Sequence, residues 1–360
     1  MTSAMHSDVI NPATEELLRS VEQTDEAGVD DAVARAKAAQ RKWAAQAPAD
    51  RAAALRAFAA VVDAHTEELA ALEVANSGHP IGNARWEAGH VRDVLQYYSA
   101  SPERLSGKQI PVAGGLDVTF NEPLGVVGVI TPWNFPMTIA SWGFAPALAA
   151  GNAVLVKPAE WTPLTTIRLG ELAVEAGLPA DLLCVLPGRG SVVGERFVSH
   201  PDVRKIVFTG STEVGTRVMA GAAAQVKRVT LELGGKSAAL VLDDADLEQT
   251  VGGLATASLL NTGQTCYMST RILVPGSRYD EYLDAISAMC ASLPVGDPMD
   301  ENVAVGPLAS GRHRDRVLSL IERGRTEGGT VTTGGGTPSG VDRGFFVEPT
   351  VFAGIDNSAT

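Results

Sequence analysis

Cysteine is scarce in this chain, with 3 residues among 360. A small and odd number of cysteines argues against a disulfide-stabilised fold and favours a reducing compartment, so we expect a cytoplasmic protein. Cys184 and Cys290 fall in apolar segments and are interpreted as buried packing residues. The cysteines and the 6 histidines show none of the spacings typical of zinc sites, so no metal is predicted. His65 and His79 are interpreted as surface groups rather than ligands.

Long apolar runs and an excess of positive charge are also absent. The most apolar stretch, residues 139–156, is interrupted by Pro146, and no stretch reaches the roughly 18 apolar residues of a membrane helix. The N-terminus lacks the basic and apolar regions of a signal peptide. The formal net charge is −13, which argues against binding to nucleic acid or to an anionic membrane. We therefore predict neither a membrane nor a nucleic-acid partner.

The first hundred residues have the apolar spacing of helices. We expect one helix that ends before Pro48, a second over residues 55–78 and a third over residues 86–99. Residues 108–122 differ, because Gly114 and Gly115 separate two short extended runs. This pattern is typical of a β-hairpin.

From residue 125 onward, predicted strands and helices alternate. The apolar runs are continuous rather than alternating, which is typical of a parallel sheet covered on both faces. A second α/β segment begins at residue 238, and residues 345–352 are expected to form its last strand. The predicted fold class is therefore α/β. The predicted strands of the first sheet are residues 125–130, 153–157, 182–186, 205–208 and 228–233.

Cys266 and Glu232 have the chemistry needed for covalent catalysis on a carbonyl group. Cys266 ends the loop Asn261-Thr262-Gly263-Gln264-Thr265-Cys266, which consists of small and polar residues. A thiolate can attack a carbonyl carbon, and a carboxylate can later activate water. Glu232 ends an apolar strand, and we expect confinement beside Leu231 and Leu233 to raise the pKa of its carboxyl group. The Gly-x-Ser-x-Gly motif of many serine hydrolases is absent.

Asn134 follows the first predicted sheet strand, in Thr131-Pro132-Trp133-Asn134-Phe135-Pro136. Open α/β sheets bind ligands at the carboxyl ends of their strands, where an amide donor can polarise a carbonyl oxygen. The alternative is that Asn134 only caps the following helix. The spacing alone does not distinguish the two.

Lys157 and Glu160 close the next predicted strand. A lysine and a glutamate three residues apart at this edge suit a sugar with hydroxyl groups. A glutamate that accepts from a ribose diol also repels an additional phosphate, which favours NAD over NADP. The alternative is an exposed ion pair without a ligand.

Two glycine-containing loops each lead into a predicted helix. Residues 188–194 form the first, and residues 208–215 form the second, directly after a strand. Backbone N–H groups in such loops can surround a pyrophosphate. Neither loop has the Gly-x-Gly-x-x-Gly fingerprint, and ordinary strand-to-helix turns also use glycine and a Ser/Thr cap.

Taken together, these motifs resemble the aldehyde dehydrogenase superfamily, in family order and over nearly the whole chain. The resemblance implies a Rossmann-like NAD-binding domain in residues 1–107 and 123–233, and a second α/β catalytic domain in residues 234–360. It also implies that hairpin 108–122 joins subunits in a homodimer or homotetramer. The matching segments are residues 131–136, 157–160, 208–215, 231–236, 263–266, 294–298, 306–308 and 344–352.

The resemblance implies oxidation of an aldehyde to a carboxylic acid. Cys266 would form a thiohemiacetal and then a thioester, with the oxyanion held by the Asn134 side chain and the Cys266 backbone N–H. Hydride would pass to the nicotinamide, and Glu232 would activate the water that releases the acid. Lys157 is assigned both to this catalytic set and to the adenine-side ribose. The cofactor-binding residues implied are Ile130, Trp133, Lys157, Glu160, Gly190, Gly210, Ser211, Val214, Gly215 and Leu233.

The length of the chain departs from the family pattern. Family members usually continue into a Glu-Glu-Ile-Phe-Gly-Pro segment that contacts the nicotinamide side of the cofactor, and this chain ends before it. We therefore expect a truncated catalytic domain and poor dehydrogenase activity for the 360-residue chain. An inactive or structural paralogue, or a cofactor-independent thiol esterase, remains the alternative. Tyr267 and Trp142 either line the aldehyde tunnel or simply pack.

Overall fold

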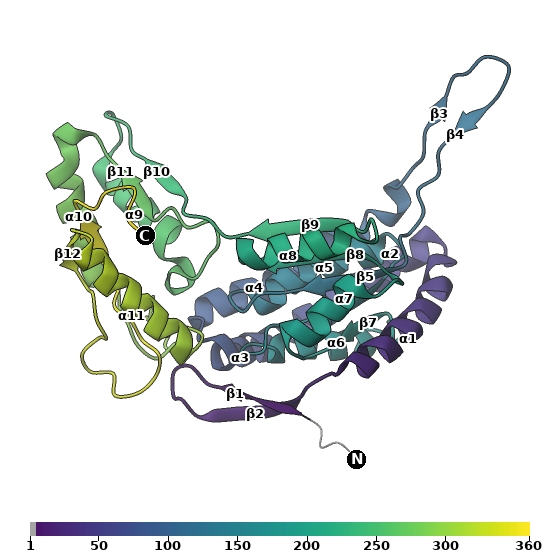
Figure 1. Ribbon diagram of the computed structural model, residues 1–360, viewed down its shortest axis with the longest axis horizontal. Coiled ribbons are helices and arrows are strands. Elements are labelled where there is room, and N and C mark those ends of the chain that lie inside the picture. Colours follow the sequence, from purple (N-terminus) through teal and green to yellow (C-terminus); the bar gives the residue numbers. More distant parts are fainter. Residues whose placement is uncertain (1–4) are drawn as a thin grey trace. The chain divides into compact units, whose positions relative to one another are not determined.

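The computed structural model describes residues 5–360 (Figure 1). The chain forms two compact units. The first unit consists of residues 5–7, Ser20–Ala70 and Arg85–Leu233. The second consists of Asp8–Arg19, Ala71–Ala84 and Gly234–Thr360.

Two short strands, β1 (His6–Ile10) and β2 (Leu17–Glu22), pair near the N-terminus. The prediction that the first hundred residues are helical is therefore wrong for this segment. In β2 only Val21 is buried. The strand consequently has no alternation of buried and exposed apolar residues that could have revealed it.

Four helices follow, and their apolar stripes give the predicted periodicity. Helix α1 (Glu26–Ala44) begins at Asp25, whose carboxylate accepts from the Gly28 N–H and so satisfies one free donor of the first turn. The predicted helix over residues 55–78 is divided in two at His65, where the backbone leaves the helical region. The remaining helices are α2 (Pro48–Ala64), α3 (Thr66–Ser77) and α4 (Ile81–Ser99).

A five-stranded sheet forms the centre of the first unit, with strand order β7-β6-β5-β8-β9 and all neighbours parallel. The two central strands β5 and β6 are buried at every residue, which explains their unbroken apolar sequence. The predicted parallel sheet is confirmed. Its strands are β5 (Val126–Ile130), β6 (Ala153–Lys157), β7 (Leu183–Val185), β8 (Val203–Gly210) and β9 (Arg228–Leu233).

Helices connect the strands of this sheet in the predicted alternation. The most buried is α5 (Pro136–Ala149), which approaches the sheet closely at Gly143, where a Cβ atom would come within 2.5 Å of Val129 Cγ1. A π-helical turn, Gly190–Gly194, leads into α7. The other helices are α6 (Leu164–Glu175), α7 (Glu195–Ser199) and α8 (Thr212–Ala223).

The predicted hairpin is present between a short 3-10 turn, Pro102–Arg104, and β5. Its strands β3 (Gln109–Ile110) and β4 (Asp117–Val118) pair antiparallel and are exposed. Gly114 has the positive φ of 75° that a tight turn requires. Figure 1 shows the hairpin extending from the rest of the first unit.

The second unit is also α/β. Strands β10 (Ala238–Leu240) and β11 (Arg271–Leu273) pair parallel, and β12 (Thr330–Thr333) pairs antiparallel with β13 (Val351–Ala353). The predicted strand over residues 345–352 is wrong, because only its end is a strand. Phe346 and Val347 are buried in an irregular segment, and the Phe345 N–H donates to the Pro12 carbonyl. The helices are α9 (Leu247–Leu259), α10 (Tyr279–Ser292) and α11 (Gly311–Thr326).

No helix within residues 5–360 is long and apolar enough to span a membrane.

Candidate active site

The register of the parallel sheet places the ends of four strands at one edge. Ile130 pairs with both Lys157 and Phe208, and Gly210 pairs with Leu233. Because the strands are parallel, these residues are their carboxyl ends, where open α/β sheets bind ligands. The sheet thus brings together four residues predicted to bind cofactor: Ile130, Lys157, Gly210 and Leu233.

Asn134 lies half-buried in the turn between β5 and α5. Phe135 occupies the N-cap position of α5, and its side chain forms no cap hydrogen bond. Asn134 therefore precedes the N-cap residue and does not occupy the N-cap position. The same turn is held by Thr162, whose hydroxyl donates to the Trp133 carbonyl at 3.1 Å. Asn134 remains a candidate oxyanion donor of the first unit.

Lys157 is buried at the end of β6, with 5% of its surface exposed. Its Nζ donates to the Pro158 carbonyl at 2.5 Å. Burial lowers the pKa of Lys157 to about 8, and the nearby charge of Glu160 opposes this shift. The alternative of an exposed ion pair is wrong for the lysine, because a buried ammonium group has lost most of its water.

The two glycine loops differ in what their glycines do. Gly190 begins the π-helical turn, and a Cβ atom at this position would meet nothing within 4 Å. Gly210 is packed, because a Cβ atom there would come within 2.7 Å of Phe208 Cζ. The Ser211 hydroxyl accepts from the Val214 N–H at 3.3 Å and caps α8. The alternative of an ordinary helix cap thus explains the Ser211 side chain, while the open backbone at Gly190 can still approach a ligand.

Glu232 lies on β9, the edge strand of the sheet, opposite Thr209 of β8. Its side chain is exposed. The prediction that Glu232 is confined beside its apolar neighbours is therefore wrong. An edge strand has only one neighbour, and alternate side chains of β9 face away from the covered side of the sheet.

Cys266 lies in the second unit, on the loop that follows α9, and it is exposed and free. The predictions for the other two thiols are confirmed for Cys290, which is buried, and only partly for Cys184, which is half-buried. Burial raises the pKa of each of these two thiols to about 11. A thiol with so high a pKa is a poor nucleophile at neutral pH. Cys266 is the most exposed thiol of the three.

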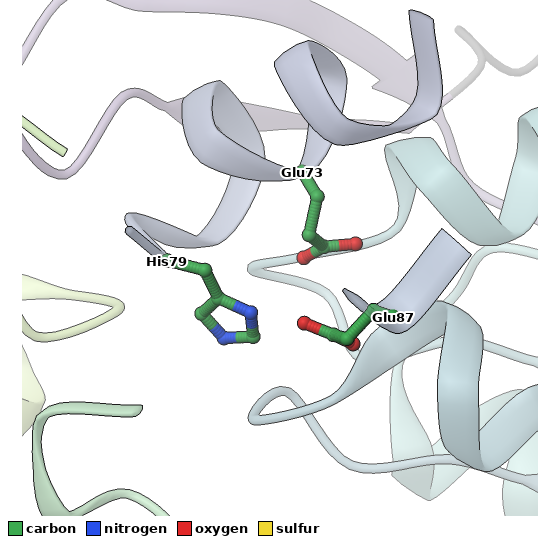
Figure 2. Close-up of side chains that lie close together, drawn as sticks. All are labelled: Glu73, His79 and Glu87. Atoms are coloured by element: carbon green, nitrogen blue, oxygen red, sulfur yellow. The ribbon is translucent and has the colours of Figure 1, made fainter. Parts of the chain in front are cut away.

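Three buried side chains near the connection between α3 and α4 lie close together: Glu73, His79 and Glu87 (Figure 2). Their ligand atoms all lie within 4.8 Å of one another, so this set could hold a cation. His79 is 1% exposed, and its interpretation as a surface group is wrong. The sequence did not reveal the set, because its spacing follows no metal-binding motif and depends on the packing of two helices.

Aromatic side chains gather where α4 packs against α5. Trp142 Nε1 donates to His90 Nε2 at 2.9 Å, and the Trp86 ring stacks on the His90 ring with centroids 5.0 Å apart. Trp86 and Trp142 are 53% and 44% exposed, and Tyr267 in the second unit is also exposed. Both tryptophans thus pack against His90 and remain half-exposed. The structure does not distinguish a role of Trp142 in the aldehyde tunnel from simple packing.

Comparison with known proteins places this chain in a family. The whole chain, residues 1–360, matches the model of the aldehyde dehydrogenase family. A geranial dehydrogenase from Castellaniella defragrans is 45% identical over 99% of this chain and 75% of its own length. The NAD+ complex of an aldehyde dehydrogenase from Bacillus cereus is 38% identical, with a TM-score of 0.96 over 99% of this chain and 73% of that one.

A 3,6-anhydro-L-galactose dehydrogenase solved in complex with NAP is 33% identical. It has a TM-score of 0.97 and covers 99% of this chain and 76% of its own. The α/β fold with a parallel sheet, expected from the sequence, is therefore confirmed, and the relatives include proteins solved with either form of the cofactor. The chain belongs to the aldehyde dehydrogenase family of NAD(P)-dependent oxidoreductases.

Proposed function

We propose that this chain oxidises an aldehyde to a carboxylic acid, with Cys266 as the nucleophile and NAD as the hydride acceptor. The observation that carries the proposal is the accessibility of Cys266. It is exposed, whereas burial raises the pKa of Cys184 and Cys290 to about 11. The family and the residues at the sheet edge support the same reaction.

The residues at the sheet edge fit a dinucleotide. Lys157 supplies a buried ammonium group with a lowered pKa, and Glu160 supplies a carboxylate for a ribose diol. The open backbone at Gly190 and the N-terminus of α8 offer N–H groups near the strand ends, which suits phosphate. We assign cofactor binding to residues 1–107 and 123–233 and catalysis to residues 234–360. When bound, the nicotinamide accepts the hydride from the substrate carbon.

The residues of the chain perform the other steps. The Cys266 thiolate adds to the aldehyde carbon and forms a thiohemiacetal. The oxygen of this adduct accepts hydrogen bonds from the Asn134 side chain and from the Cys266 backbone N–H. Once hydride has left, the acyl group remains on sulfur as a thioester. Glu232 takes a proton from water as the water attacks the thioester, and the carboxylic acid is released.

An exposed Glu232 is compatible with this role. A general base must reach a water molecule, and an exposed carboxylate is in contact with water. The exposed hairpin offers a surface for subunit association, because Leu116 and Phe120 are 75% and 81% exposed. We propose a homodimer or homotetramer formed through residues 108–122.

Two substitutions test the catalytic assignment. Cys266→Ala should abolish aldehyde oxidation and ester hydrolysis, because both need the sulfur nucleophile. Glu232→Gln should allow the acyl-enzyme to form but slow its hydrolysis, so that mass spectrometry detects an acyl group on Cys266. Full turnover by Cys266→Ala would show that the nucleophile is assigned wrongly.

The same assays separate the alternatives. An aldehyde dehydrogenase forms NADH from NAD and aldehyde, whereas a cofactor-independent thiol esterase only hydrolyses esters. An inactive or structural paralogue does neither. Geranial is a suitable first aldehyde, given the name of the relative that is 45% identical.

A further inference from the structure

We propose that Thr262 and Gln264 are positioning residues that hold the loop carrying Cys266 in a strained shape. This inference rests on the proposed function of Cys266. It adds two side chains that do not touch the reacting atoms but fix where the thiol emerges from the loop. Thr262, Gln264 and their partners all belong to the second unit.

The loop has a backbone shape that its residues do not adopt readily. Asn261 has φ 54° and ψ 45°, and Thr262 has φ 57° and ψ 32°. Both are left-handed, which is tolerable for asparagine but unfavourable for threonine, because its β-branched side chain crowds the backbone. Such a conformation costs on the order of 1–3 kcal/mol and persists only where the surroundings enforce it.

Thr262 supplies one of the enforcing contacts. Its Oγ1 accepts from the Gly306 N–H at 3.1 Å and donates to the Gly306 carbonyl at 3.3 Å. Gly306 is closely packed, because a Cβ atom there would come within 2.3 Å of the Gly78 carbonyl oxygen. The hydroxyl therefore bonds to a tightly packed backbone segment.

Gln264 supplies the second contact, two residues before Cys266. Its Oε1 accepts from the Ala309 N–H at 3.0 Å, and its Nε2 donates to the Asn261 carbonyl at 3.2 Å. The side chain is buried, with 7% exposed, so these bonds are shielded from water. The two anchors act on the same partner, residues 306–309, and enclose the left-handed turn between them.

The two anchors set the orientation of Cys266. If the left-handed residues relaxed to ordinary backbone angles, the thiol and the Cys266 N–H would turn away from their positions in the loop. A displacement of about 1 Å can cost about 100-fold in rate when a reaction depends on orientation. Alkylation of an exposed thiol depends mainly on access and should change little.

Thr262→Val tests the proposal, because valine keeps the shape of threonine and removes both hydrogen bonds. The first readout is the burst of 4-nitrophenolate from 4-nitrophenyl acetate. In this step the Cys266 sulfur bonds to the acetyl carbon, the ester C–O bond breaks and 4-nitrophenolate leaves. We expect the burst rate to fall at least about tenfold, while alkylation of Cys266 by iodoacetamide falls less than threefold. Thr262→Ser, which keeps the hydroxyl, should restore the burst rate.

A matched control is Thr250→Val in the first turn of α9, where the hydroxyl donates to the Asp246 carbonyl at the end of the helix opposite to the loop. It should leave the burst rate unchanged. Equal burst rates for Thr262→Val and the wild type, or equal loss of burst and alkylation, would overturn the positioning role. Hydrogen exchange at the amides of Gly306 and Ala309 gives an independent readout. If wild-type Cys266 shows no burst, the proposed nucleophile is wrong. In that case hydrogen exchange still tests the positioning role. A Gly306 amide that exchanges equally slowly in Thr262→Val and in the wild type would overturn it.

Discussion

Gly215 of α8 lies directly against Leu233 at the end of β9, where a Cβ atom at position 215 would come within 2.6 Å of Leu233 Cδ2. Through this contact α8 packs against β9, the strand that carries Glu232. Gly215→Ala should therefore push Leu233 outward and destabilise the protein by about 1–3 kcal/mol, as overpacking does. It should also weaken NAD binding, because Leu233 lies at the carboxyl end of β9 and is one of the residues assigned to cofactor binding. Thermal unfolding and titration with NAD measure both effects.

Gly252→Ala on α9 is the matched control for this prediction. A Cβ atom at position 252 meets nothing within 4 Å, and alanine favours a helix over glycine by up to about 1 kcal/mol. Gly252→Ala should raise the unfolding temperature slightly. A Gly215→Ala variant as stable as Gly252→Ala would show that Leu233 moves aside without cost.

Lys157→Met should stabilise the protein without cofactor at pH 7 and weaken NAD binding. Burial lowers the pKa of Lys157 to about 8 in the folded state, whereas an unfolded lysine titrates near 10.4. Between these values the unfolded chain binds more protons, so the wild type gains stability as pH rises from about 8 to 10.4. The advantage of methionine is thus largest below pH 8, at most about 3 kcal/mol, and shrinks above it.

Denaturant unfolding at pH 7 and pH 9.5 checks this prediction. Lys42→Met on the exposed surface of α1 is the control, because it removes an ammonium group that is not buried. A constant difference for Lys157→Met would mean that Lys157 titrates normally in the folded protein.

The parallel sheet was predictable because its two central strands are buried on both faces. In β5 and β6 the burial is complete, so the apolar runs are unbroken and mark both the strands and their order along the chain. The pairing of β1 with β2 was not predictable, because β2 buries only Val21. The irregular segment before β13 was missed for the opposite reason, since Phe346 and Val347 are buried without belonging to a strand.

The positions of Lys157 and Asn134 at the carboxyl ends of two strands were predictable, because Lys157 ends an apolar run and Asn134 lies in the turn after another. Burial at the site was less predictable, because it depends on neighbours that are distant in sequence. Glu232 is exposed since β9 is the edge strand, and the strand order is set by tertiary packing rather than by the residues of β9. His79 is buried for a similar reason, since packing between helices determines its surroundings.

Glu160→Gln should reduce the preference for NAD over NADP. Glu160 is half-buried and stands close enough to Lys157 to oppose the shift of its pKa. A carboxylate there repels a 2′-phosphate, whereas an amide does not. We expect the ratio of affinities for NAD and NADP to fall by about tenfold, which corresponds to about 1.4 kcal/mol. Calorimetric titration with both cofactors measures the ratio, and an unchanged ratio would place the ribose elsewhere.

Trp142→Ala should impair the oxidation of large planar aldehydes more than that of small ones. Trp142 lies on α5, which begins two residues after Asn134, and its indole is held by the bond from Nε1 to His90 Nε2. A held, half-exposed indole offers an apolar face at little further cost in side-chain entropy. We expect kcat/KM for cinnamaldehyde to fall about tenfold, or about 1.4 kcal/mol, with less than a twofold change for acetaldehyde.

His90→Gln keeps an acceptor for the indole and should behave like the wild type, whereas His90→Leu should resemble Trp142→Ala. Tyr97→Ala, at an exposed aromatic residue further along α4, is the control and should change neither rate. Equal losses for both aldehydes in Trp142→Ala would instead assign the tryptophan to the stability of the α4–α5 packing.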